Sequence, residues 1–198
     1  MNKPKFIESI RIEKGEFQNL HYHQERVDNT SKAFSFTRKF NLNSISLSHI
    51  KDDDIYKSRI LYSEDEYSMD ISKYIKRDIS SLKLVCDNDI DYGFKYENRE
   101  CLDQLFMKRE GCSDILIIKN GLITDTSFSN IVLFDGLDYF TPKTYLLNGI
   151  MRQNLLERKI IIEKEIRVED LKTYKTVFLI NALNTLYDNL SVEVSCIS

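Results

Sequence analysis

The stretch DILIIKNGLITDTSFSNIVLFDGLDYF, residues 114–140, decides the fold class of this chain. Its first half is an apolar run, an Asn-Gly pair and a second apolar run. This arrangement is the strongest short-range signal for a β-hairpin. The second half repeats it around Asp135-Gly136. We therefore expect two successive hairpins in this part of the chain.

Helical patterns flank these hairpins. Residues 96–110 carry apolar side chains at helical spacing on one face, and Gly111 follows as a typical helix stop. A second helix is expected to begin after Gly149. The run TVFLINAL, residues 176–183, predicts a last buried strand.

The first half of the chain adds further strands and a helix. The expected elements are two strands around Lys14-Gly15 in residues 6–20, a helix in 21–34, and strands in 58–63 and 81–87. Together the elements predict an α+β fold with two lobes. We expect a small N-terminal lobe at residues 1–90 and a larger C-terminal lobe at 91–198.

Composition narrows the class of protein. The 198 residues are 42% hydrophobic, enough for one globular unit or two small lobes with cores. The net charge of -3 comes without a basic stripe, so no nucleic-acid partner is expected. The sequence offers neither a bilayer-spanning segment nor an apolar signal-peptide core. We therefore expect a soluble cytoplasmic protein with no membrane partner.

The cysteines agree with that compartment. None of the four forms a CxxC pair or a regular spacing, which favours free thiols in a reducing cytoplasm. They are Cys86, Cys101, Cys112 and Cys196.

Three features could bind an anion such as phosphate. Gly149 precedes a predicted helix, whose first backbone N–H groups have no partner within the helix. His23 and Arg26 lie one turn apart on another helix, and an arginine fork suits phosphate. Arg59, in a strand, could grip a carboxylate. Taken singly, these could equally be an ordinary capped helix, a surface arginine and a salt bridge.

A polar cluster follows the first hairpin. Asp125 is succeeded by Ser127, Ser129 and Asn130 before the next apolar run. Small polar side chains of this kind can orient a polar ligand ring, although a plain polar loop has the same composition. No metal site is expected, because the histidines have no carboxylate at ligand spacing.

Lys95 lies between two aromatic residues, Phe94 and Tyr96. It is either a solvated surface charge or a reactive amine held in an apolar pocket. With phosphate donors and a ring partner elsewhere in the chain, an amine completes the set that a phosphorylated aldehyde cofactor needs.

Five segments, in chain order, resemble the class IV aminotransferase family of fold type IV pyridoxal-phosphate enzymes. This family includes branched-chain and D-amino acid aminotransferases and 4-amino-4-deoxychorismate lyase. The segments are FIESIR (6–11), HQERV (23–27), FKYENR (94–99), GLITDTSFSNIVLF (121–134) and LLNGIMRQ (146–153). The resemblance implies the family's two-lobed fold, similar to D-amino acid aminotransferase, and pyridoxal 5'-phosphate as cofactor.

The resemblance also assigns roles to matching residues. Lys95 matches the Schiff-base lysine, which also moves protons at the substrate Cα. Asp125 matches the acid that pairs with the pyridine nitrogen, and Arg26 matches an arginine that binds the phosphate. The other expected cofactor-binding residues are Ser129, Asn130, Gly149, Ile150 and Met151. The candidate substrate-binding residues are His23, Arg59 and Asn181.

The chain departs from the family's pattern in three places. Asp125 replaces the usual glutamate, so its carboxylate reaches about one bond less far. Met151 replaces the common threonine, which leaves a backbone donor but no hydroxyl. The family's N-terminal strand and D-R-G-x-x-x-G-D-G segment, which helps form the substrate pocket, are expected to be missing.

The resemblance leaves two reactions open. NGIMRQ (148–153) and FLINAL (178–183) resemble the lyase, which releases pyruvate and 4-aminobenzoate, whereas Glu8 in FIESIR resembles the transaminases. The lyase is favoured, and an amino-acid transaminase is the alternative. A third hypothesis is a cofactor-binding protein without turnover, against which the retention of Lys95 and Asp125 argues. Relatives are homodimers with the site at the lobe junction, so we expect a homodimer.

Overall fold

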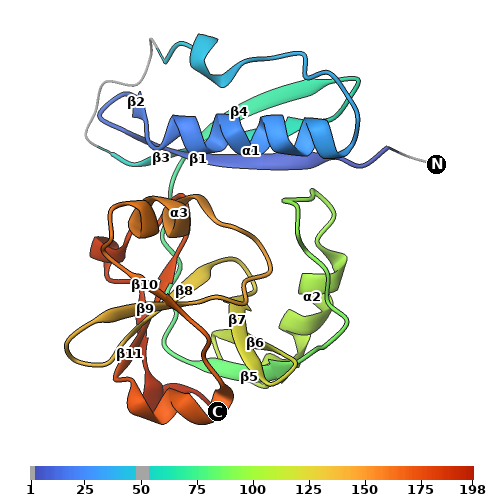
Figure 1. Cartoon of the computed structure of the whole chain (residues 1–198). Coiled ribbons are helices and arrows are strands. Elements are labelled where there is room, and N and C mark those ends of the chain that lie inside the picture. Colours follow the sequence, from blue (N-terminus) through green and yellow to red (C-terminus); the bar gives the residue numbers. More distant parts are fainter. Residues whose placement is uncertain (1–2, 48–53) are drawn as a thin grey trace. The chain divides into compact units, whose positions relative to one another are not determined.

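The structure is a computed structural model that describes residues 3–47 and 54–198. These residues form two compact units with a mixture of helices and sheets, which confirms the α+β class (Figure 1). Unit 1 is the chain up to Ile75 together with Phe94–Asn98. Unit 2 is Lys76–Gly93 together with Arg99–Ser198.

This division differs from the expected lobes at 1–90 and 91–198. Strand β5 (Leu82–Cys86), expected in the first lobe, pairs in parallel with β6 (Asp114–Lys119) of unit 2. The segment around Lys95, expected in the second lobe, returns to unit 1. Both exchanges depend on pairing between segments distant in sequence, which local patterns do not carry.

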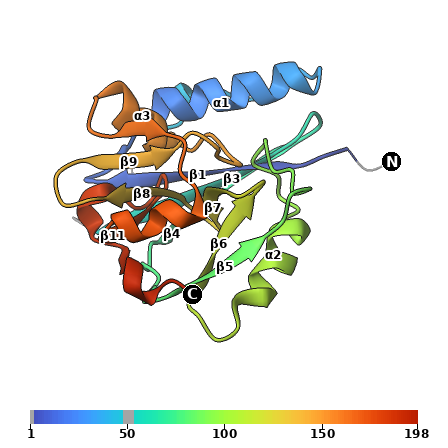
Figure 2. The same cartoon turned by 60° about the horizontal axis from the view of Figure 1, so that its bottom comes forward.

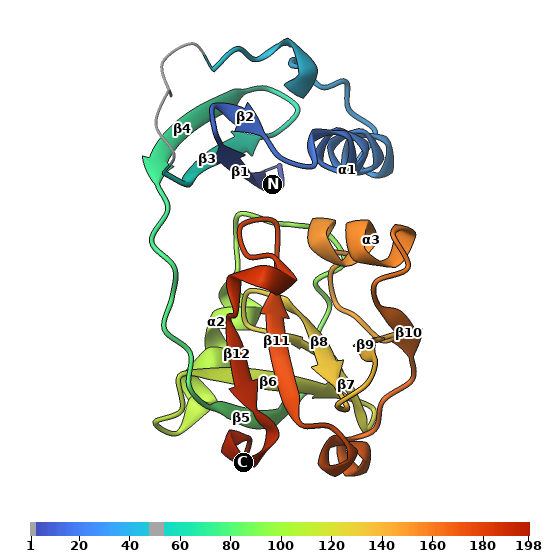
Figure 3. The same cartoon turned by 90° about the vertical axis from the view of Figure 1, so that its left-hand side faces the viewer.

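Unit 1 is a four-stranded antiparallel sheet with a helix along one face (Figures 1 and 3). The strand order is β2-β1-β3-β4. The elements are β1 (Phe6–Glu13), β2 (Glu16–Phe17), α1 (Leu20–Ala33), the 3-10 helix η1 (Leu42–Ser44), β3 (Tyr56–Tyr62) and β4 (Tyr67–Lys73).

The local patterns of unit 1 explain most of these elements. Lys14 and Gly15 both have positive φ, 53° and 74°, as a two-residue hairpin turn requires, so the predicted β1–β2 hairpin is confirmed. The predicted helix and the strand at 58–63 are confirmed as α1 and β3. The core buries Phe6, Ile10 and Val27 between the sheet and the helix.

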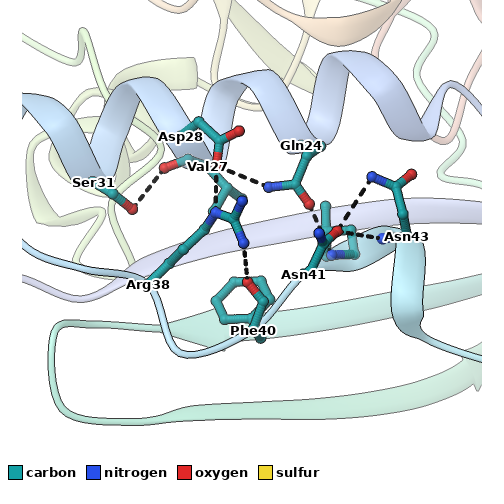
Figure 4. Close-up of polar contacts among 9 residues, drawn as sticks. Gln24, Val27, Asp28, Ser31, Arg38, Phe40, Asn41 and Asn43 are labelled. Atoms are coloured by element: carbon teal, nitrogen blue, oxygen red, sulfur yellow. Dashed lines mark hydrogen bonds and ion pairs between the residues drawn. The ribbon is translucent and has the colours of Figure 1, made fainter.

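The segment after α1 is fastened to that helix by side-chain hydrogen bonds (Figure 4). The side-chain oxygen of Gln24 accepts from the Leu42 N–H at 2.8 Å, and its amide nitrogen donates to Asp28 at 2.9 Å. Arg38 donates to the same Asp28 carboxylate at 2.5 Å. These bonds stabilise the helix that carries two candidate site residues.

Unit 2 contains two sheets and two short α-helices. One sheet has the order β5-β6-β7, side by side in Figure 2, and the other has the order β10-β9-β8-β11-β12. The remaining α-helices and strands are α2 (Glu100–Phe106), β7 (Leu122–Thr126), β8 (Asn130–Phe134), β9 (Tyr139–Pro142), α3 (Ile150–Glu157), β10 (Ile162–Lys164), β11 (Thr176–Ile180) and β12 (Ser191–Glu193). The 3-10 helices are η2 (Met107–Arg109), η3 (Val168–Thr173), η4 (Leu186–Asp188) and η5 (Val194–Cys196).

Both predicted hairpins of unit 2 are confirmed. β6 pairs antiparallel with β7 across Asn120-Gly121, whose φ values are 54° and 75°. β8 pairs antiparallel with β9, and the Asp135 carboxylate accepts from the N–H groups of Leu137 and Asp138 within the turn.

Two element predictions need correction. α2 begins at Glu100 rather than at residue 96, because the preceding residues pair with β1 instead of turning into a helix. The strand at 176–180 is confirmed as β11, but it is not the last strand, since β12 pairs with it. The predicted helix after Gly149 is confirmed as α3.

No helix among residues 3–47 and 54–198 is both long enough and apolar enough to cross a membrane. The four cysteines are free thiols.

Candidate functional site

Three polar side chains form a buried cluster in unit 1. Glu8 on β1 accepts two hydrogen bonds from Arg26 on α1, from Nε to Oε1 at 2.8 Å and from Nη2 to Oε2 at 2.6 Å. His23, one turn earlier on α1, contacts Oε2 through Nδ1 at 2.5 Å. Glu8 and His23 are fully buried, and the Arg26 side chain is 12% exposed. The helix thus presents His23 and Arg26 on one face, as predicted, and β1 supplies their shared partner.

Burial and charge set the protonation of this cluster. Burial raises the pKa of Glu8, but the charge of Arg26 and the hydrogen bonds from Arg26 and His23 outweigh it and hold that pKa at about 2. Burial lowers the pKa of His23, and the charges of Arg26 and Lys95 lower it further against the influence of Glu8. At neutral pH the cluster is a carboxylate, a guanidinium and a neutral imidazole.

The tautomer of His23 follows from its partner. An ionised carboxylate only accepts hydrogen bonds, so Nδ1 carries the imidazole hydrogen and donates it to Glu8. Nε2 is then an acceptor, and it has no hydrogen-bond partner among the described residues.

Lys95 is anchored to β1 through its backbone and its neighbours. The Ile7 N–H donates to the Lys95 carbonyl at 2.9 Å. Tyr96 forms a bridge to Phe6, with ring centroids 5.4 Å apart. Lys95 itself is half-buried, and its charge contributes to the low pKa of His23. The structure therefore brings the predicted lysine into electrostatic range of the cluster that contains the predicted arginine.

Arg59 lies on β3 of the same unit. Its guanidinium is 3.7 Å from the Glu97 carboxylate, and the two side chains are 40% and 39% exposed. An ion pair this open to solvent contributes little to stability. Arg59 can therefore exchange this partner for another anion at small cost.

Asp125 is the centre of a second cluster, in unit 2. Its Oδ1 accepts from the Asn130 amide nitrogen at 2.8 Å, and Oδ2 accepts from the N–H groups of Leu146 and Leu147 at 3.0 and 3.1 Å. The same Asn130 nitrogen donates to the Leu147 carbonyl at 2.8 Å. A β-carbon on Gly149 would lie 1.9 Å from the Asn130 side-chain oxygen, so only glycine fits there. Asp125 and Asn130 together fix the loop that leads into α3.

Burial raises the pKa of Asp125 to about 6. Asn130, the two loop N–H groups and the charge of Arg152 act in the opposite direction. The Arg152 guanidinium is itself nearly buried, ion-paired with Glu163 and 4.2 Å above the Tyr145 ring. A carboxylate with this pKa is mostly ionised at neutral pH, and a bound cation would favour the ionised form further.

The start of α3 is suited to an anion. Gly149 is the N-cap, in an extended conformation, and no side chain of residues 3–47 or 54–198 caps the helix. The first backbone bond of the helix runs from the Gln153 N–H to the Gly149 carbonyl at 3.0 Å. The N–H groups of Ile150 and Met151 therefore precede the helical ladder, at the positive end of the helix dipole.

Two predicted side chains have structural partners. The hydroxyl groups of Ser129 and Thr126 form a hydrogen bond of 2.7 Å inside the turn between β7 and β8. The Asn181 side-chain oxygen accepts from the N–H groups of Leu183 and Asn184 at 2.8 and 3.0 Å, which closes the turn after β11.

The candidate residues divide between the units. Unit 1 contains Arg26, His23, Arg59 and Lys95. Unit 2 contains Asp125, Ser129, Asn130, Gly149, Ile150, Met151 and Asn181.

Sequence reasoning did not identify Glu8 and Arg152 as partners of these residues. A carboxylate among buried apolar residues of one strand was the available signal for Glu8. No comparable pattern marks Arg152.

Comparison with known proteins identifies the family. The sequence matches the family described as amino-transferase class IV over residues 5–188. An uncharacterized protein of Haemophilus influenzae is 33% identical over 184 residues, covering 91% of this chain and 98% of that protein. The crystal structure of a proposed 4-amino-4-deoxychorismate lyase from Haemophilus somnus 129pt is also 33% identical. It has a TM-score of 0.87 and covers 94% of this chain and 100% of its own.

A more distant structure shares the fold alone. It is that of a proposed amino-acid aminotransferase from Mesorhizobium loti, 18% identical, with a TM-score of 0.81 over 98% of this chain and 99% of its own. Since the family match covers nearly the whole sequence, this chain belongs to the class IV aminotransferase family and is a pyridoxal-phosphate-dependent enzyme.

Proposed function

We propose that this enzyme is a 4-amino-4-deoxychorismate lyase, which releases pyruvate and 4-aminobenzoate from aminodeoxychorismate. The observation that carries the proposal is the 33% identity to the Haemophilus somnus protein over 100% of that chain. The segments NGIMRQ (148–153) and FLINAL (178–183), which resemble the lyase branch, support it.

The residues present fit pyridoxal phosphate. Asp125 is a buried carboxylate whose Oδ1 accepts one hydrogen bond from the described part of the chain, so it retains capacity for a donor. The uncapped start of α3 offers N–H groups to a phosphate. When bound, the cofactor supplies an electron sink for the electron pair left at the substrate Cα.

Lys95 is the residue to which we assign covalent attachment of the cofactor and proton transfer at the substrate Cα. Its backbone is held by Ile7 and its flanking ring by Phe6, so the side chain starts from a fixed point. Such anchoring reduces the conformational entropy that the amine loses when it is positioned at the substrate Cα.

Asp125 is the residue to which we assign the pyridine nitrogen. Its negative charge would hold a proton on that nitrogen and so strengthen electron withdrawal by the ring. The backbone bonds from Leu146 and Leu147 fix the carboxylate before any ligand binds, which is the condition for electrostatic preorganisation.

The phosphate is assigned to Arg26 and to the N–H groups of Ile150 and Met151. The planar guanidinium of Arg26 suits a phosphate, and Glu8 accepts from its Nε and Nη2. Asn130 and Gly149 support this assignment indirectly, since their close contact fixes the start of α3.

Three further side chains are assigned to binding of the substrate. His23 offers a buried acceptor at Nε2, Arg59 a half-exposed guanidinium, and Asn181 an amide at the end of β11. The carboxylates of aminodeoxychorismate are suitable partners for Arg59.

We further propose that the enzyme is a cytoplasmic homodimer, as its family relatives suggest.

An amino-acid transaminase of the branched-chain or D-amino acid type is the second candidate. Glu8 in FIESIR favours it, because that segment resembles the transaminases. A protein that binds the cofactor without turnover is the third. The buried acid at Asp125 argues against it, since a carrier has no use for a ring-nitrogen partner.

The test is to incubate the purified protein with aminodeoxychorismate and, separately, with amino acids plus 2-oxo acids. We expect pyruvate release from aminodeoxychorismate to be faster than transamination of any common amino acid. Transamination without pyruvate release would assign the enzyme to the second candidate, and no turnover of either kind to the third.

A further inference from the structure

We propose that Glu8 is a positioning residue for the cofactor's phosphate: it holds the guanidinium of Arg26 in the orientation in which Arg26 binds that group. The inference rests on the assignment of Arg26 to the phosphate under the proposed function. It adds a buried acid that touches neither the phosphate nor the reacting atoms.

The geometry of the pair favours this role over that of an incidental ion pair. Glu8 takes two parallel bonds from Arg26, at 2.8 and 2.6 Å, and has no exposed surface. Two bonds from a planar fork fix the guanidinium plane as well as its distance. A second pair on the same strand is more open to solvent: Arg11 donates from Nε to Glu13 at 3.0 Å, and the Glu13 side chain is 39% exposed.

His23 completes the support. Its Nδ1 donates to Oε2 of Glu8, the oxygen that also accepts from Nη2 of Arg26. The carboxylate is therefore held from two positions on α1 and cannot rotate without breaking bonds to both side chains. Because α1 carries both donors, the helix and β1 together determine where the Arg26 guanidinium lies.

Two effects of Glu8 on a phosphate oppose each other. Its negative charge offsets the charge of Arg26, so removing it should strengthen the attraction for a phosphate. Its hydrogen bonds orient Arg26, so removing them should weaken phosphate binding. A glutamine has one accepting oxygen and an NH₂ group, which would face an N–H of Arg26 or of His23. We expect the loss of orientation to dominate for this reason.

The measurement compares pyridoxal phosphate with pyridoxal, which lacks the phosphate. The ratio of the two dissociation constants, from absorbance titrations, is the phosphate preference of each variant. Glu8→Gln should lower this preference about ten- to a hundredfold, the range for losing hydrogen bonds to a charged group. Its affinity for pyridoxal should change by no more than about twofold, because pyridoxal has no phosphate for Arg26 to bind. A merely structural defect would instead weaken the binding of both ligands alike.

Matched variants isolate the mechanism. Glu13→Gln makes the same change in an arginine pair of the same strand and should leave the preference unchanged. Arg26→Ala should lower the preference at least as much as Glu8→Gln, with the N–H groups of Ile150 and Met151 supplying what remains, and adding Glu8→Gln to Arg26→Ala should have no further effect. If Glu8→Gln fails to fold, Glu8→Asp keeps the charge but is too short for both bonds, so it should show a smaller loss of preference.

The outcomes separate the inference from the proposed function. An unchanged or increased preference in folded Glu8→Gln or in Glu8→Asp, with Arg26→Ala lowering it, overturns the positioning role and leaves the assignment of Arg26 intact. An unchanged preference in Arg26→Ala overturns both. Pyruvate release from aminodeoxychorismate is measured separately and depends on neither result.

Discussion

Lys95 is flanked by aromatic rings and held by a backbone bond from Ile7, and these contacts distinguish it from the many exposed lysines of the chain. If it attaches the cofactor, borohydride treatment of the loaded protein should fix the adduct on the peptide that contains Lys95. Peptide mass spectrometry checks this. Lys95→Ala should give no adduct, and an adduct on another lysine would refute the assignment.

Asp125 has both an electrostatic and a structural role, and substitution can separate them. Asp125→Asn removes the charge, so turnover should fall by about a hundredfold, the usual effect of losing one preorganised electrostatic partner. The amide also cannot satisfy Asn130 and the two loop N–H groups together, because its NH₂ group must face a donor. We therefore expect a loss of stability as well.

Asp125→Glu is the matched variant, since it keeps the charge and restores the family residue. It should retain much more activity than Asp125→Asn. Turnover is compared after the bound cofactor of both variants has been measured, and covalent attachment should survive in each. Wild-type turnover of Asp125→Asn would mean that Asp125 serves only to hold the loop.

At the scale of elements, the start of α3 depends on the contact between Gly149 and Asn130. Gly149 has φ -72° and ψ 149°, which alanine adopts easily, so Gly149→Ala tests space alone. The added carbon would lie 1.9 Å from the Asn130 oxygen and force that side chain off Asp125. We expect a cost of about 1–3 kcal/mol in unfolding free energy and weaker binding of pyridoxal phosphate.

Two variants control this prediction. Gly93→Ala places its new carbon 3.7 Å from the nearest atom, Asp91 Oδ1, so it should be tolerated. Asn130→Ala removes the side chain that Gly149→Ala strikes, so the double variant should be less destabilised than the sum of the single ones. Urea unfolding of the four variants measures both effects. Strict additivity would show that the steric contact is not the cause.

The elements that the sequence predicted well are those with a local cause. The turns at Asn120-Gly121 and Lys14-Gly15 need positive φ, and the glycine in each pair favours such a turn. The predicted start of α2 was wrong because Tyr96 pairs with Phe6, far away in the sequence. In the site, motifs predicted Asp125 and Arg26 as candidates, but their partners Leu146 and Glu8 depend on tertiary packing.

At the scale of the whole molecule, pairing between segments distant in the sequence also explains why the two units differ from the predicted lobes. Unit 1 takes back Phe94–Asn98 after the chain has begun unit 2 with β5. No composition change or turn signal marks such an exchange, so a single boundary near residue 90 was the natural prediction. Each unit nevertheless has its own apolar core, around Phe6 in unit 1 and around Leu116 in unit 2.

The two buried carboxylates should give the units opposite responses to acid. The folded-state pKa of Glu8 is about 2, below its usual 4.5, so its contribution to stability is present above pH 4.5 and is lost as the pH falls toward 2. The folded-state pKa of Asp125 is about 6, above its usual 3.8. The folded form then binds more protons than the unfolded form, so stability falls as the pH rises from 3.8 to 6. Each displacement corresponds to roughly 3 kcal/mol.

Hydrogen exchange of the cofactor-free protein, corrected for intrinsic rates, resolves the two units. From pH 7 to about 4.5, amides of β7 in unit 2 should gain protection, while those of β1 in unit 1 should lose some below pH 6.5, because His23 stays uncharged in the folded unit and becomes charged in the unfolded chain. Below about 4.5, the amides of β1 should lose further protection, because protonated Glu8 no longer pairs with the charge of Arg26. Glu8→Gln should abolish this further loss in β1 only, and Asp125→Asn the gain in β7 only. Loss of protection in both units over the same pH range would mean that other groups control the acid response.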